Sequence, residues 1–135
     1  MSHFTRVRTA LRDAQLLAEA LAGVGYPGAE VHDAPQVLFG YQGDARPETA
    51  EVIVRRAQIG DASNDIGFRR ADDGTFEAII SDFDRHRHGE PWLRQLTQQY
   101  GRSATLQYAE RNGFEVTGEE RQTDGSIRLL LRRSS

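Results

Sequence analysis

The sequence contains no cysteine and no lysine, and each absence removes a class of chemistry. Without cysteine, the chain cannot form disulfides, iron–sulfur clusters, zinc–thiolate sites or thiol nucleophiles. All 17 basic residues are arginine, which also excludes a Schiff-base lysine and a phosphate-loop lysine. We attribute the absence of lysine to a genome that is biased toward arginine codons rather than to the function of the protein.

Long hydrophobic runs and a large excess of one charge are missing too. No run approaches the 18 or more apolar residues that a membrane span needs, and the polar N-terminus has no secretory pattern, so we expect a soluble cytoplasmic protein with no membrane contact. The net charge is -3 and the arginines are scattered, which gives no clear electrostatic footprint for nucleic acid. A length of 135 residues predicts one domain, residues 1–135.

The first half of the chain predicts strands around one amphipathic helix. HFTRVRT alternates like a strand, and apolar residues at helical spacing predict a helix from Leu11 to Val24 that a following glycine ends. A strand near Glu30 to His32, a turn at Pro35 and a strand QVLFGYQG come next, and residues 43–50 read as a polar loop.

The second half predicts a meander, a long helix and a hairpin. EVIVRRA, DIGFRRA and TFEAIISDF read as strands that are separated by turn sequences. A helix begins near Pro91, is bent or broken at Gly101 and ends at Asn112–Gly113. The C-terminal residues then form a hairpin that turns at Asp124–Gly125.

This order of elements predicts an α+β fold, in which a largely antiparallel sheet of about seven or eight strands carries two helices on one face. Both halves share the order strand, helix, strand, strand, which suggests a pseudo-repeat. Alternation places the following residues toward the helices: Val52, Val54, Ile66, Phe68, Phe76, Ala78, Ile80, Ile127, Leu129 and Leu131. It places a mixed-charge set on the opposite face, where cross-strand ion pairing is our favoured interpretation: Glu51, Arg55, Asp65, Arg69, Glu77, Arg128 and Arg132.

The segment DFDRHRHGE raises the question of a metal site. Asp82, Asp84, His86 and His88 fall on alternate residues, so a strand would present two imidazoles and two carboxylates on one face. The glycine and proline that follow indicate instead a connection between a strand and a helix, and the interleaved arginines disfavour a bound cation. We therefore favour a polar loop with surface histidines and keep the metal site as an alternative.

Other constellations indicate binding rather than catalysis. No nucleophile elbow, phosphate loop or dinucleotide fingerprint is present, so we predict no catalytic residue and no cofactor. The loop GYQGDARPETA offers an aromatic face and an anion contact. The candidate contact surface comprises Tyr41, Arg46, Arg55, Arg69 and Arg128.

Several short motifs in order resemble one family. They are SHFT, the GY after the first helix, GYQG, VIVR, DIGF, the acidic Asp82, TQQY, NGFEV and DGSIRLLLRR. Together they resemble the hypothetical chloroplast reading frame 35 family, domain of unknown function 1257, of plastids, cyanobacteria and other bacteria. The resemblance extends from Ser2 to Arg133.

The resemblance implies a cytosolic or stromal protein with no assigned activity, cofactor or catalytic residue. It also implies an association with AAA-type ATPase systems, since bacterial relatives can be encoded near them. Members of the family have a longer segment with aromatic residues and glutamine where this chain has DRHRHGE. A metal site there would therefore be peculiar to this protein, and Asp82 is the residue of this segment that the family pattern shares.

The leading hypothesis is a non-enzymatic binding or adaptor domain that acts through protein contact. A small metal-binding protein or enzyme that uses the Asp82–His88 segment is the first alternative. Nucleic-acid binding through Arg55, Arg69, Arg128 and Arg132 is the second, and we do not favour it. The C-terminal SIRLLLRR could pair with a copy of itself, which leaves a homo-oligomer open.

Overall fold

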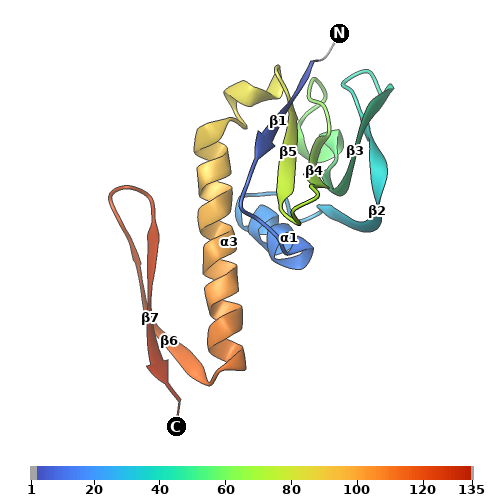
Figure 1. Ribbon diagram of the computed structural model, residues 1–135. Coiled ribbons are helices and arrows are strands. Elements are labelled where there is room, and N and C mark those ends of the chain that lie inside the picture. The colour runs from blue at the N-terminus through green and yellow to red at the C-terminus, as the bar shows by residue number, and fades with distance from the viewer. Residues whose placement is uncertain (1–2, 135) are drawn as a thin grey trace.

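The computed structural model, which describes residues 3–134, has a five-stranded antiparallel sheet as its body. In spatial order the strands are β1 (Phe4–Arg8), β5 (Phe76–Ser81), β4 (Ile66–Arg70), β3 (Ala45–Val54) and β2 (Glu30–Phe39). Two helices, α1 (Ala14–Gly23) and α3 (Glu90–Arg111), pack against each other beside one face of this sheet (Figure 1). A short helix α2 (Arg56–Ile59) and a 3-10 helix η1 (Asp84–His86) lie in the connections.

The last two strands, β6 (Phe114–Arg121) and β7 (Ile127–Arg133), form a sheet of their own. Figure 1 shows this hairpin on the far side of α3 from the body. The α+β class, the antiparallel pairing and the number of seven strands are confirmed. We predicted one sheet for all seven strands, whereas the structure has two. We call residues 101–134, the second half of α3 with this hairpin, the arm, and the preceding residues the body.

The helix α1 follows from its local sequence. The Asp13 side chain accepts a hydrogen bond from the Leu16 amide at 3.0 Å, so it caps the helix instead of lying within it. The predicted helix therefore begins three residues later, at Ala14. It ends before Gly25, whose φ of 106° a glycine adopts without strain.

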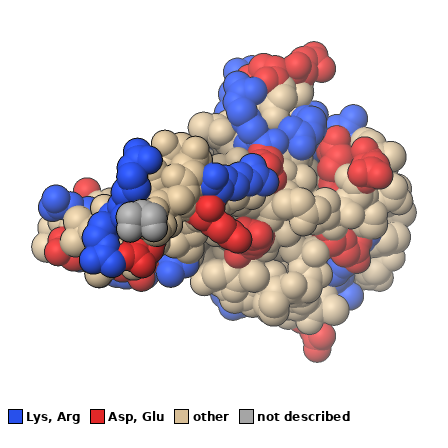
Figure 2. Space-filling view, turned by 90° about the horizontal axis from the view of Figure 1, so that it is seen from below, with Lys and Arg blue, Asp and Glu red and all other residues tan. Residues whose placement is uncertain are grey.

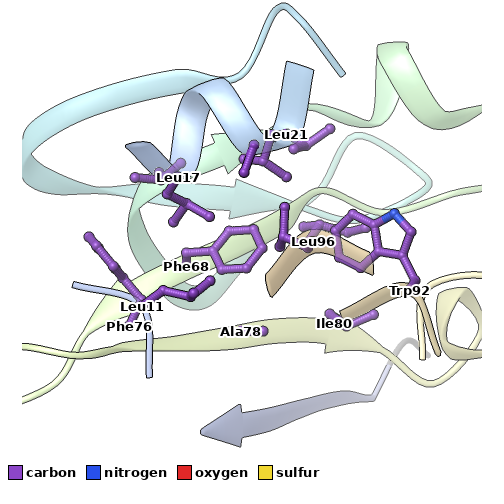
Figure 3. Close-up of a cluster of buried hydrophobic side chains, with 13 residues drawn as sticks. Leu11, Leu17, Leu21, Phe68, Phe76, Ala78, Ile80, Trp92 and Leu96 are labelled. Carbon is purple, nitrogen blue, oxygen red and sulfur yellow. The ribbon is translucent and has the colours of Figure 1, made fainter. Parts of the chain in front are cut away.

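The main core lies between the sheet and the two helices. Leu17 and Leu21 of α1 meet Phe68, Phe76 and other residues of the sheet, and Trp92 and Leu96 of α3 close the cluster (Figure 3). The predicted helix-facing residues of β3, β4 and β5 all belong to this cluster, which confirms the assignment of that face. Burial of one such leucine or phenylalanine contributes about 1.5–3 kcal/mol.

The opposite face of the sheet differs from the prediction of a mixed-charge surface. Leu38, Ala50, Ile53 and Ile79 form a second, fully buried cluster there, with Phe4 packed against it. The Arg46 guanidinium of β3 lies 5.4 Å from the centroid of the Phe4 ring, although β3 and β1 are not neighbours in the sheet. The first half of β3 therefore curls across this face and covers the cluster.

Three predicted boundaries are wrong around β2 and β3. Pro35 does not separate two strands, because β2 runs through it with a register shift that an edge strand tolerates. Residues 43–50 are not a loop, since β3 begins at Ala45. EVIVRRA is not one strand either: β3 ends at Val54 and α2 follows.

The second helix is confirmed, but it is not broken. It runs without interruption through Gly101 as one helix of 22 residues. Ile127 and Leu129 of β7 line a shallow pocket with Gly101 and Arg102, so this strand faces α3 as predicted. Within the described part of the chain, no helix is long and apolar enough to cross a membrane.

Candidate contact surface

The segment after β5 is a connection between a strand and a helix, as predicted. The strand ends at Ser81, η1 occupies Asp84–His86, and α3 begins at Glu90. Asp82 is exposed and accepts a hydrogen bond from the Thr5 hydroxyl at 2.9 Å. The alternation of the four candidate ligands therefore does not place them on one face of a strand.

Asp84 is buried, and its carboxylate has protein partners. One oxygen accepts hydrogen bonds from the Ser81 hydroxyl at 2.6 Å, the Asn64 amide at 3.0 Å and the Asn64 side chain at 3.1 Å. Burial alone would raise the pKa of Asp84, but the hydrogen bonds from Ser81 and Asn64 outweigh it and hold the pKa below its ordinary value. Asp84 thus ties the connection after β5 to the loop that precedes β4.

His88 contradicts the expectation of a surface histidine. It is 3% exposed, and its Nε2 lies 2.6 Å from the Tyr26 hydroxyl. The ring also packs edge-on against Trp92, with 4.9 Å between centroids, whereas His86 is exposed. Burial lowers the pKa of His88, so the imidazole is neutral at pH 7. His88 is therefore part of the packing between α1 and α3.

These placements bear on the metal-binding alternative. Asp84 and His88 point to different protein partners, and Asp82 and His86 are exposed. Among residues 3–134, no three histidine or carboxylate side chains gather as a ligand set.

A second buried carboxylate, Asp65, follows Asn64 in the chain and holds the end of β2 and the start of α2. It is 1% exposed, although the sequence placed it on a solvated face. Its oxygens accept hydrogen bonds from the Phe39 and Arg56 amides at 2.8 and 2.7 Å, and Arg55 forms an ion pair with it at 2.8 Å. Arg55 also contacts Glu30, and this hydrogen bond is the main cause that lowers the pKa of Glu30. Arg55 is thus an internal tether rather than a free contact residue.

The same tethers fix the loop after β2. The Tyr41 amide donates to the Asn64 side chain at 2.9 Å, and the Tyr41 carbonyl accepts from the Arg56 guanidinium at 2.7 Å. Asn64 also donates to Asp84. One continuous set of hydrogen bonds therefore runs from the β5 connection to the tip of the β2–β3 hairpin.

The tethered segment presents apolar side chains to solvent. Three large hydrophobic residues of β2 and one of the loop that follows are exposed, and we call them the β2 strip: Val31 (37%), Val37 (39%), Phe39 (38%) and Tyr41 (41%). In its second half they alternate with the buried Leu38 and Gly40. Only Tyr41 of this strip was among the predicted contact residues.

The remaining predicted contact residues do not gather around Tyr41. Arg46 lies over Phe4 and beside Asp44, Arg69 donates to the Thr49 hydroxyl, and Arg128 is on the hairpin arm. The arginines of the nucleic-acid alternative are likewise split between the body and the arm. In Figure 2, basic and acidic side chains are interleaved at the hairpin end of the molecule rather than collected by sign.

Sequence reasoning missed Val37 and Phe39, although a signal was present. The stretch VLFGY places apolar or aromatic side chains two residues apart, which in an edge strand exposes one set and buries the other. Asn64 and Asp65 were missed because their partners lie 9 to 26 residues away in the chain.

The relatives of this chain cover almost its whole length. It is 29% identical over 134 residues to an uncharacterised protein ycf35 of Cyanophora paradoxa, and 27% identical over 138 residues to a protein of the same name from Guillardia theta. Each match covers 98% of both chains. No solved structure matches this chain.

A family model matches residues 20–130. The matched range contains the end of α1, all of α3, β2 to β6 and the first part of β7. Since it spans most of the chain, the protein belongs to the family described as protein of unknown function (DUF1257).

Proposed function

We propose that this protein is a non-enzymatic binding domain that acts through protein contact, with the β2 strip as its contact surface. The observation that supports the proposal is the exposure of four large apolar side chains on one edge strand and the loop that follows it. Contiguous exposed apolar surface on a soluble domain marks an interaction site, and an edge strand adds unpaired backbone groups.

The rigidity of the strip favours the same function. Asp65 holds the Phe39 amide, Arg55 donates to the Val37 carbonyl at 2.9 Å, and Asn64 holds Tyr41. A surface that is already ordered loses little conformational entropy on binding, so these internal hydrogen bonds favour affinity. The location of the protein in the cytoplasm and the identity of the partner stay predictions.

The test begins with affinity capture from the native host, in which a AAA-type ATPase system is the first partner class to examine. The identified partner is then purified, and its dissociation constant is measured for the wild type and for a Val37→Ser, Tyr41→Ser variant. We expect the variant to bind at least about tenfold more weakly. Phe83→Ser is the matched control, because Phe83 is 54% exposed but lies outside the strip. Equal affinity of the strip variant, or turnover of a small molecule by a solitary protein, would contradict the proposal.

A further inference from the structure

The strand β1 is a free edge of the sheet with backbone groups that face away from it. The Thr9 amide donates to the Phe76 carbonyl and the Asp82 amide to the His3 carbonyl, so in this antiparallel pair Thr5 and Val7 also bond to β5. The amide and carbonyl groups of Arg6, between them, point outward. Such an edge can accept another strand.

A groove beside this edge has room for that strand. It has a volume of about 500 Å³ and runs between Val7 and Arg8 of β1 and Leu93 and Thr97 of α3. Val7 and Leu93 both pack partly against the main core, and each also lines the groove. A strand added to β1 would therefore find an apolar surface for the side chains that it turns toward α3.

The charges across the sheet show which strand fits. Glu77 of β5 stands opposite Arg8 on one side and opposite Arg69 on the other, so basic and acidic residues alternate across three strands. Because β1 is the edge strand of the sheet, no strand lies on the other side of Arg8 to continue this alternation of charge. The next strand should be acidic on the face that carries Arg6 and Arg8, because opposite charges on adjacent strands stabilise each other.

The strand β6 has this acidic face. Glu115 and Glu120 stand opposite Arg132 and Arg128 of β7 on one side, and the other edge of β6 carries no strand. Both glutamates point away from α3, since the residue before each of them contacts that helix. On β1 the arginines also point away from the helices, because the intervening Val7 packs toward them.

We propose that β6 of a second copy of this chain pairs with the free edge of β1. The pairing joins the hairpin of one copy to the sheet of the other, and a two-fold axis makes the exchange reciprocal, so each sheet contains seven strands. The alternative in which β7 pairs with β1, or with itself, brings arginine against arginine. This dimer leaves the β2 strip free, so it goes beyond the proposed function and does not depend on it.

The first test exchanges charges without breaking the hairpin. In the variant Glu120→Arg, Arg128→Glu the cross-strand pair within the hairpin is kept, but β6 now presents a basic residue to β1. Sedimentation should show the wild type at twice the chain mass of 15.1 kDa and the variant dissociating at least about tenfold more readily. Adding Arg6→Glu should restore the dimer, because Arg6 stands opposite the uncharged Ile79 and its reversal disturbs no pair within the body.

The matched control exchanges the ion pair between Arg102 of α3 and Glu119 of β6. Glu119 faces α3, so Arg102→Glu with Glu119→Arg should leave the dimer intact. Circular dichroism must show native secondary structure for each variant. A monomeric wild type overturns the proposal, and so does a dimer that the Glu120 and Arg128 exchange does not weaken.

A cross-link tests the proposed contact between β1 and β6 directly. Since the chain has no cysteine, Arg6→Cys and Glu120→Cys can be introduced into separate preparations, each with a single thiol. Mixing and mild oxidation should give a covalent heterodimer in preference to either homodimer, because a disulfide requires Cα atoms within about 7 Å. Equal yields of all three products, or none, would exclude the pairing of β1 with β6.

Discussion

The body and the arm of this molecule differ in how many of their residues are buried. Of the 19 buried hydrophobic residues among residues 3–134, the body, from β1 to the first half of α3, contains 18, and the arm, residues 101–134, contains Ala109. The six buried polar residues of the described chain are in the body as well. The arm therefore depends on half-buried contacts between α3 and a two-stranded hairpin, and such a hairpin is only marginally stable without an element to pack against.

The largest effect should come from the main core of the body. Leu17 is fully buried between α1 and the sheet, so Leu17→Ala removes contacts and leaves a cavity. We expect a loss of about 2–5 kcal/mol in the free energy of unfolding, measured by urea denaturation. A loss below about 1 kcal/mol would show that the body is as loosely packed as the arm.

The buried carboxylate of Asp84 should have the next largest effect. Asp84→Ala removes the acceptor and leaves the buried donors of Asn64 and Ser81 unsatisfied, so we expect a loss of about 2–3 kcal/mol. Asp82→Ala is the matched control two residues earlier, where the side chain is exposed and the change should stay within about 0.5 kcal/mol. Because the folded state lowers the pKa of Asp84, its contribution is present above the ordinary value of 3.8 and is lost as the pH falls through the folded value. Equal losses for both variants would contradict the tether.

Protonation of His88 should lower the free energy of unfolding as the pH falls, by less than the loss of the Asp84 carboxylate. Its pKa is lowered in the folded state, so the unfolded chain binds the proton first as the pH falls. The stability contribution is present above the ordinary pKa of 6.5 and declines below it toward the folded pKa, with a slope of at most about 1.4 kcal/mol per pH unit. Urea unfolding at pH 7, 6 and 5 should show this decline in the wild type and in the exposed-site control His86→Ala, but not in His88→Phe. A decline that survives in His88→Phe must come from another group.

The same contrast explains what could be predicted from the sequence. The core residues of β3, β4 and β5 follow from alternation, and α1 from its apolar spacing, because local pattern and burial agree there. Asp65, Asp84 and His88 resemble surface residues in sequence, and only partners distant in the chain bury them. Nor does any local signal state that β6 and β7 leave the sheet, since their alternation suits either arrangement.

The arm should respond less than the body to the loss of a leucine. Leu129 faces α3 but is only half-buried, so Leu129→Ala should cost about 1 kcal/mol or less under conditions where the protein is monomeric. Hydrogen exchange should show the same order, with amides of β6 and β7 exchanging faster than those of β4 and β5. Slower exchange in the hairpin than in the central strands would reverse the comparison.

Metal ions are expected to leave the stability of the protein unchanged, which is the smallest effect of the series. Asp84 Oδ2 already accepts hydrogen bonds from Asn64 and Ser81, and His88 Nε2 is hydrogen-bonded to the Tyr26 hydroxyl. A cation that binds through these two atoms would have to displace these partners. Addition of Zn²⁺ or EDTA to untagged protein should leave the melting temperature unchanged, and metal analysis should give the same content for the wild type and a His86→Ala, His88→Ala variant. Stabilisation by Zn²⁺ that the variant loses would establish the metal-binding alternative. It would also show that these side chains can come together around one ion, although no three of them gather among residues 3–134.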